Sequence, residues 1–235
     1  MKIRSSPLSL ADRPLGGSFG NGAAPSPWTA APVSAVTAFF EMLARTLPGG
    51  GQPPFAAMPW RPCVHLAMFA HRVRDLECGL YVLVRDARDE DALRASFRDS
   101  FVWKRPEELP GGTPLFLLAA GDYRRHAMSV SCTQEIASHG AFALGMIARY
   151  RETLEESGPW FYRRLHWEAG AVGQVLYLEA EAAKLRATGI GCFFDDAMHE
   201  QFGLADDRFQ TIYHFTVGAP VEDPRLATME AYAVR

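Results

Sequence analysis

A long helical pattern in the C-terminal half places the strongest constraint on how this chain can fold. Residues 162–187 carry apolar side chains at steps of three and four, the spacing of one helix face: Leu165, Ala169, Val172, Leu176 and Leu178. A second helical pattern is expected over 133–154. Glycines interrupt both segments, and each costs about 1 kcal/mol in a helix relative to alanine. They are expected to permit close packing of another helix or of a flat ligand.

Shorter segments predict strands and two further helices. Short apolar runs bounded by turn signals predict strands, while mixed charged and apolar patterns predict helices. The strands are expected in 64–73, 79–86, 113–122 and 209–220, and the helices in 35–47 and 89–101. The first two strands are expected to form a hairpin or to lie side by side. Because strands and helices do not alternate regularly, the fold class expected is α+β in layers.

The two ends of the chain differ in composition from the middle. Residues 1–32 are rich in Gly, Pro, Ala and Ser and predict an irregular arm. Residues 33–226 are expected to form one domain, and residues 227–235 a C-terminal tail. A length of 235 residues is ample for a sizeable core.

Composition and charge exclude several classes of function. The chain is 48% hydrophobic with a net charge of −3, and its basic residues are scattered among acidic ones, which argues against a nucleic-acid partner. No apolar run is long enough to span a bilayer, and no signal segment opens the chain, so no membrane partner is expected. The predicted location is cytoplasmic.

The four cysteines show no metal-binding or disulfide pattern. Cys63, Cys78, Cys132 and Cys192 lie far apart without a CxxC pair, so buried free thiols in a reducing compartment are expected, and no metal site. Cys192 is expected to pack rather than to take part in redox chemistry.

The segment Gly189-Ile190-Gly191 is expected to be a turn at the end of the long helix. One glycine suffices to end a helix, because only the first residue beyond it must tolerate a positive φ. The second glycine therefore needs another reason, and close approach of the backbone to a ligand supplies one.

Taken together and in order, several blocks resemble the nitroreductase family, and more narrowly its SagB-type dehydrogenase branch. The resemblance covers about residues 60–226. It is carried by Tyr162-Arg163, Glu168-Ala169-Gly170, Gln174, Gly189-Ile190-Gly191, Asp195-Asp196, Gly203-Leu204 and Val217-Gly218-Ala219-Pro220, together with the segment "SCTQEIA".

The resemblance implies a nitroreductase-like fold, with a central and mostly antiparallel sheet wrapped by helices. It also implies a homodimer with FMN at the subunit interface. The residues expected at the cofactor are Gly189, Ile190, Gly191 and Gln134, with Arg225 at the phosphate and Arg4 and Ser5 as additions there, and those at the substrate pocket are Arg163 and Gln174. No catalytic side chain is assigned, because in such enzymes the cofactor carries the chemistry.

The N-terminal part departs from the family pattern. The family's Arg-Arg-Ser-x-Arg helix is represented only by "KIRSSPLSLADR", and the Lys-Tyr pair associated with azoline oxidation is missing before Tyr162. Two interpretations therefore stay open. One is an FMN-dependent oxidoreductase that uses NAD(P)H and passes electrons to a small organic acceptor. The other is a degenerate, non-catalytic module that dimerises with a partner enzyme or acts as its scaffold.

Overall fold

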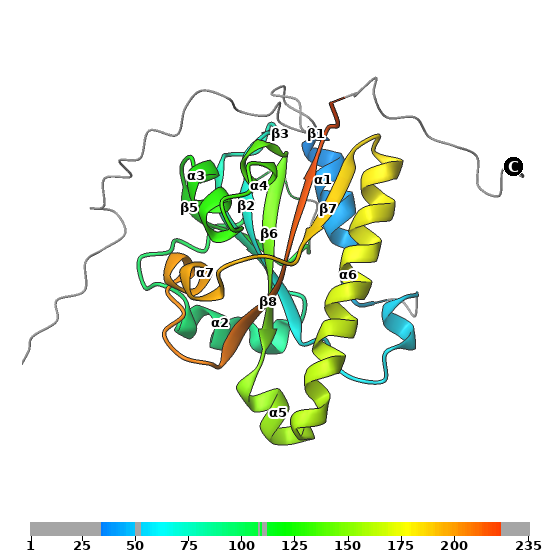
Figure 1. Ribbon diagram of the computed structural model, residues 1–235, viewed down its shortest axis with the longest axis vertical. Helices are drawn as coiled ribbons and strands as arrows, with labels where there is room; N and C mark the ends of the chain where they lie inside the picture. Colours follow the sequence, from blue (N-terminus) through cyan, green and yellow to red (C-terminus); the bar gives the residue numbers. More distant parts are fainter. Residues whose placement is uncertain (1–33, 50–52, 108, 110–111, 222–235) are drawn as a thin grey trace, which may run out of the picture.

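The computed structural model describes residues 34–49, 53–107, 109 and 112–221. A six-stranded sheet forms the centre of the molecule, with strand order β5-β4-β2-β6-β8-β7 and every neighbouring pair antiparallel (Figure 1). Its strands are β2 (Val64–Ala70), β4 (Gly79–Leu83), β5 (Leu115–Ala120), β6 (Phe142–Arg149), β7 (Arg186–Ile190) and β8 (Phe209–Gly218). Two short strands, β1 (Ser34–Ala35) and β3 (Val73–Arg74), pair in parallel beside it.

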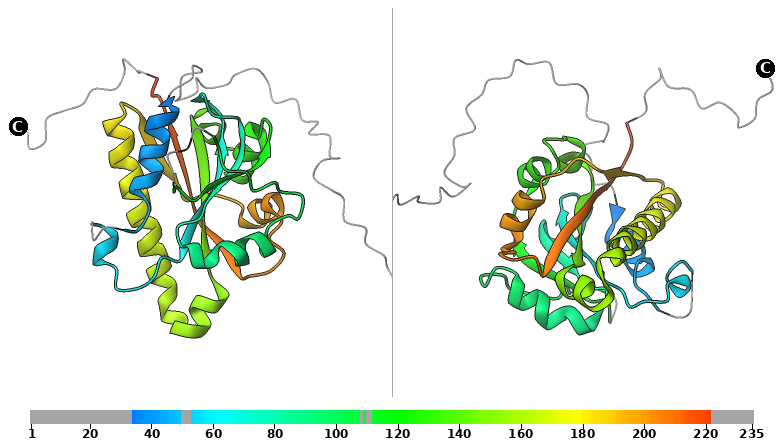
Figure 2. Two further views of the ribbon diagram at one scale, coloured as in Figure 1. Left: turned by 180° about the vertical axis from the view of Figure 1, so that it is seen from behind. Right: turned by 60° about the horizontal axis from the view of Figure 1, so that its bottom comes forward.

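Helices cover both faces of this sheet (Figure 2). One face packs against α1 (Val36–Arg45) and α6 (Tyr162–Ala182), and the other against α2 (Glu90–Ser96), α3 (Arg124–Val130), α4 (Ile136–His139) and α7 (Asp195–Phe202). The remaining helix, α5 (Arg151–Ser157), follows β6. Short 3-10 turns lie at Phe55–Ala57, Ala87–Asp89 and Pro159–Phe161. Within the described ranges, no helix is long and apolar enough to cross a membrane.

The period of two along each strand divides the core into two clusters. In β2, Leu66 and Met68 face the α1–α6 side, whereas Ala67 and Phe69 face the side of α2, α3, α4 and α7. Because both faces are covered by helices, the whole of β2 is buried. The α+β class and the antiparallel sheet expected from the sequence are confirmed.

The helix expected over residues 133–154 is wrong. Residues 136–139 form the short α4, Phe142–Arg149 form the central strand β6, and α5 begins at Arg151. A fully buried strand reads as an uninterrupted apolar run, which the sequence alone cannot distinguish from a buried helix. At Gly140 the chain passes so close to β8 that a Cβ atom would lie 2.6 Å from the carbonyl oxygen of Val217.

The long helix is confirmed but ends earlier than expected. It stops at Ala182, and Lys184 takes a left-handed conformation with φ 58° before the chain enters β7. The Gly-Ile-Gly turn expected after it is also wrong, because Gly189 and Ile190 belong to β7. Of the five apolar residues expected on one face of this helix, Leu178 is 60% exposed, while the other four are buried.

Candidate functional site

A cleft of about 240 Å³ lies between α6 and the strands β7 and β8. It brings together residues from three elements of the C-terminal part of the chain: His166, Ala169, Gly170, Gly173, Gln174 and Tyr177 from α6, Gly189 from β7, and Tyr213 and Phe215 from β8. Larger hollows lie between α3 and α7, at about 450 Å³, and beside residues 122–128, at about 490 Å³. Neither of those contains a residue that the sequence predicted for the site.

The α6 wall of the cleft is shaped by two glycines. A Cβ atom at Gly170 would meet nothing within 4 Å, and one at Gly173 would lie 3.5 Å from the ring of Phe215. Packing within the described chain therefore gives no reason for glycine at position 170, although glycine weakens a helix. The open surface at Gly170 leaves room for a ligand or for a second chain.

The two glycines of the Gly-Ile-Gly segment have different surroundings. A Cβ atom at Gly189 would lie 2.7 Å from Oη of Tyr213, so this glycine is needed by a neighbour in the same chain. Its backbone N–H also donates to Oη of Tyr177 at 2.8 Å. At Gly191 the nearest atom to a Cβ would be 3.9 Å away, while the side chain of Ile190 between them is buried. Of these residues, Gly191 thus offers the backbone most open to a ligand.

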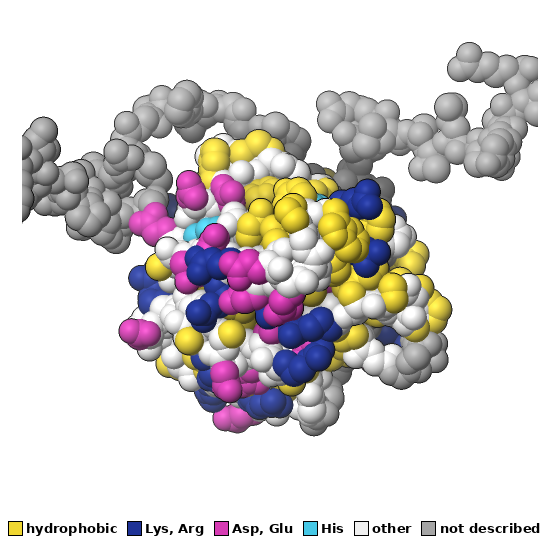
Figure 3. Space-filling model, turned by 90° about the horizontal axis from the view of Figure 1, so that it is seen from below, with side chains coloured by type: hydrophobic (Ala, Val, Ile, Leu, Met, Phe, Trp, Pro, Cys, Tyr) yellow, Lys and Arg dark blue, Asp and Glu magenta, His cyan; other side chains and the backbone are white. Residues whose placement is uncertain are grey.

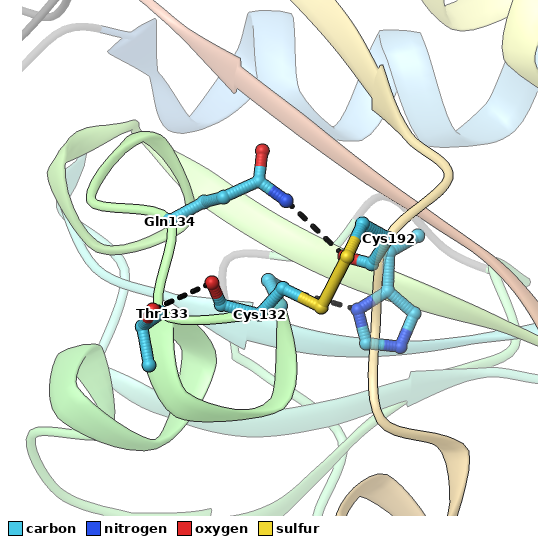
Figure 4. The surroundings of a disulfide bond; sticks show 6 residues. Cys132, Thr133, Gln134 and Cys192 are labelled. Carbon is cyan, nitrogen blue, oxygen red and sulfur yellow. Dashed lines mark hydrogen bonds between the residues drawn. A yellow bond between two sulfur atoms is a disulfide. The ribbon is translucent and has the colours of Figure 1, made fainter.

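Gln134 lies next to the segment that follows β7 (Figure 4). Its side-chain Nε2 donates to the carbonyl oxygen of Cys192 at 3.1 Å. Beside it, Cys132 and Cys192 form a disulfide across a separation of 60 residues. The expectation of four buried free thiols is therefore wrong for this pair; Cys63 is free and buried as expected, whereas Cys78 is free but exposed. No pattern in the sequence indicates this pairing, because only the fold brings the turn after α3 and the end of β7 together.

The two residues predicted for the substrate pocket lie on one face of α6 but at different levels. Gln174 lines the cleft, whereas Arg163 is exposed in the first turn, with its guanidinium 5.7 Å from the centre of the Trp167 ring. Eleven residues separate them, which is about 16 Å along a helix. The predicted cofactor residues Arg4, Ser5 and Arg225 lie outside the described residues.

The sequence analysis missed the aromatic walls of the cleft. Tyr177 stands one turn beyond Gln174, and its ring meets that of Phe215 edge to face at 4.9 Å between centroids. Tyr213 comes from β8, where the alternation of the strand would have identified it as facing the same side as Phe215. Burial lowers the pKa of His166, so its imidazole is neutral near pH 7.

Comparison with known proteins places this architecture in a family. The sequence profile described as "Nitroreductase family" matches residues 80–219, more than half of the chain. The chain therefore belongs to the nitroreductase family. That family consists of flavin oxidoreductases, and FMN is its cofactor. None of the curated protein sequences compared with the chain matches it.

Solved structures support the fold. A protein assigned to the nitroreductases from Anabaena variabilis superposes with a TM-score of 0.63 at 19% identity, covering 85% of this chain and 36% of that one. A second, from Ralstonia eutropha, gives 0.56 at 17% identity, with 93% and 89% covered. A chain of the E. coli microcin synthetase McbBCD complex, with truncated pro-MccB17 bound, gives 0.58 at 16%, with 94% and 85% covered. This chain thus spans about a third of the Anabaena protein.

The lining of the cleft suits the ring of FMN. Glycines and aromatic side chains stand on both of its walls, with Gly170, Gly173 and Tyr177 on α6 and Gly189, Tyr213 and Phe215 on the strands, and such a lining can hold a flat ring. Its described lining residues include no arginine or lysine, so a phosphate group would need cations from elsewhere. Arg4 and Arg225, the predicted phosphate ligands, are not among the described residues. The residues present fit the ring of the cofactor.

Proposed function

We propose that this chain is an FMN-dependent oxidoreductase that takes electrons from NAD(P)H and passes them to a small organic acceptor. The family assignment supports flavin chemistry in general. The observation that carries the proposal for this chain is the cleft between α6, β7 and β8, and above all its open glycine wall at Gly170. When bound, FMN supplies two-electron transfer between a nicotinamide and an acceptor.

The chain's own residues would bind and orient the cofactor. Gly170 leaves space for a flat ring, Tyr177 and Tyr213 provide aromatic side chains on the two walls, and Gly191, just beyond β7, presents an open backbone. The exposed amide of Gln174 can donate to or accept from polar edges of a ring system. Arg225, Arg4 and Ser5 are proposed to bind the phosphate, since a guanidinium matches phosphate geometry with two parallel hydrogen bonds.

A homodimer is part of the proposal. In the described part of the chain, most of the exposed large hydrophobic side chains lie on α6 or immediately before it: Trp160, Tyr162, Trp167, Tyr177 and Leu178. Figure 3, which views the molecule from below, shows hydrophobic side chains gathered on one side of the lower face. A second copy of the chain would cover such a surface and close the open side of the cleft. The proposed location is cytoplasmic.

The second function is that of a non-catalytic module that dimerises with a partner enzyme or acts as its scaffold. It is favoured because two groups predicted to contact the cofactor already have hydrogen-bond partners within the chain. The N–H of Gly189 is taken by Tyr177, and the amide of Gln134 is taken by Cys192. One structural neighbour is a chain of a multi-subunit synthetase complex. Under this alternative, the chain would dimerise without binding flavin.

The test compares the wild-type chain with Gly170→Leu, and with Ala182→Leu as a matched control on the same helix. Visible absorption after FMN addition and desalting measures retained flavin, and light scattering measures the dimer. We expect the wild type and Ala182→Leu to retain FMN with NAD(P)H oxidase activity. Filling the open wall in Gly170→Leu is expected to weaken FMN binding by about tenfold or more. A dimeric but colourless wild type at saturating FMN would contradict the oxidoreductase and favour the scaffold.

A further inference from the structure

The Cys132–Cys192 disulfide joins two segments that carry residues predicted for the cofactor site, and one of them continues directly from β7, whose Gly189 lines the cleft. Cys132 lies in the turn after α3, two residues before Gln134, and Cys192 directly follows Gly191. The bond therefore connects the backbone of two predicted cofactor-binding residues (Figure 4). Breaking it would release the restraint that holds these two segments together.

This disulfide is accessible to a reductant. Cys192 is exposed and Cys132 is half-buried, in contrast to the free thiol of Cys63, which is 2% exposed. Thiol–disulfide exchange requires that a thiolate can reach one of the two sulfurs, so exposure of Cys192 makes it the sulfur open to attack. The remaining free cysteine, Cys78, is exposed but belongs to no disulfide.

The turn that contains Cys132 has an unfavourable backbone conformation. Cys132 and Thr133 both have positive φ angles, 54° and 58°, and a β-branched residue rarely adopts this region. Such a conformation persists only where surrounding interactions hold it. Besides the disulfide, two hydrogen bonds connect the segments: Gln134 Nε2 to Cys192 O at 3.1 Å, and Phe194 N–H to Val130 O at 2.8 Å.

We propose that Cys132 and Cys192 form a reversible thiol–disulfide site that controls the cofactor cleft. In the oxidised form the bond clamps the turn 131–134 against the segment 191–194. In the reduced form the turn relaxes and FMN is held less tightly. The control of FMN binding rests on the proposed function, whereas the clamp itself does not.

The substrate class of this site is a dithiol reductant. A thiolate of the dithiol attacks Sγ of Cys192, the bond to Sγ of Cys132 breaks, and Cys132 leaves as a thiolate that takes a proton. The second thiol of the reductant then attacks the mixed disulfide, releasing Cys192 as a thiol and leaving the reductant as its cyclic disulfide. Two electrons pass from the dithiol to the protein, and both cysteines end protonated.

Reversibility follows from exposure together with the proposed compartment. Disulfides in a reducing cytoplasm are usually transient and serve catalysis or redox sensing, whereas structural disulfides belong to oxidising compartments. An exposed disulfide between two segments that carry predicted cofactor-binding residues fits the first class. We therefore expect both redox forms of the full-length chain to be folded.

The experiment uses the full chain in its oxidised form and after treatment with dithiothreitol. Peptide mass mapping identifies the bond, and amide hydrogen exchange reports on residues 130–134 and 190–194. Reduction is expected to speed exchange in both segments by about tenfold, with α6 unchanged. FMN affinity, measured by flavin fluorescence, is expected to fall by a similar factor. Cys132→Ser and Cys192→Ser should resemble the reduced protein in any buffer, and Cys78→Ser should respond to dithiothreitol like the wild type.

Each alternative outcome is decisive. Absence of the Cys132–Cys192 bond from the oxidised protein, or equal exchange in both forms, would overturn the clamp. Faster exchange with unchanged FMN affinity would overturn its control of the cofactor. If neither form binds FMN while exchange still responds to dithiothreitol, the proposed oxidoreductase fails and the clamp stands.

Discussion

The inward and outward sides of α6 are built on opposite principles. On the inward side, Glu168 is 1% exposed, and its carboxylate accepts the backbone N–H groups of Cys63 and Val64 together with the guanidinium of Arg85. On the outward side, Gly170 and Gln174 are exposed beside the cleft. Glu168, whose carboxylate has several partners, thus lies only two positions before Gly170, which is exposed at the cleft.

This difference shows which parts of the helix serve folding and which are available for binding. A buried carboxylate is tolerable only when it is paired and hydrogen-bonded, so the inward side must be satisfied within the chain. The glycine at position 170 weakens the helix and has no neighbour that requires it. We expect substitutions on the inward side to affect stability, and those on the outward side to affect binding.

The largest effect is expected from Glu168→Ala. This change leaves the buried guanidinium of Arg85 without its anion, which should lower the free energy of unfolding by about 3–5 kcal/mol. Urea denaturation followed by circular dichroism measures the loss. The matched control is Glu179→Ala on the same helix, whose partner Arg45 is largely exposed at 3.9 Å, and it should cost less than about 1 kcal/mol. Equal losses in the two variants would show that the two sides do not differ as described.

An intermediate effect is expected where β7 meets the cleft. Gly189→Ala would place a Cβ atom against the ring of Tyr213, and the displacement of that ring should cost about 1–3 kcal/mol of unfolding free energy. Gly191→Ala meets no atom closer than 3.9 Å and should change stability by less than about 0.5 kcal/mol. Thermal denaturation of both variants tests the contrast. A tolerated Gly189→Ala would mean that Tyr213 moves without cost, and this glycine would then need a different explanation.

The effect that is smallest near neutral pH, and that grows as the pH falls, concerns the buried His214 of β8. Burial lowers the pKa of His214 to about 3, with the more weakly acting Asp195 raising it. Between this value and the ordinary 6.5, the unfolded chain binds a proton that the folded chain does not, so stability falls as the pH drops below about 6.5. The loss should reach about 2 kcal/mol near pH 5.

Urea midpoints over a series of pH values measure this effect. In His214→Gln, the slope of the unfolding free energy against pH should be shallower by the equivalent of about one bound proton. The control His126→Gln, at an exposed position, should keep the wild-type slope. An unchanged slope in His214→Gln would show that His214 is not the group responsible.

Much of the fold could be predicted from local patterns. The helices α1, α2 and α6 and the strands β2, β4, β5 and β8 lie where periodicity placed them, because each has a clear period or clear turn signals. The strand β6 could not be recognised: like β2 it is buried on both faces and shows no alternation, but it lacks the turn signals that bound β2 and is followed almost at once by α5. The Gly-Ile-Gly segment was misread for a related reason: a glycine in a strand and a glycine in a turn look alike until the neighbouring strand is known.

The candidate site likewise has features that local sequence patterns predict and features that only the packing of the elements determines. The sequence alone determined the family and the residue types of α6, because these depend on order and spacing along one segment. Tertiary structure alone decided that Gly189 faces Tyr213, that Cys132 bonds to Cys192, and that Gln174 shares a cleft with β7 and β8. Each of these contacts joins residues from different elements, and their distances are set by how the sheet and its helices pack, which no local pattern records.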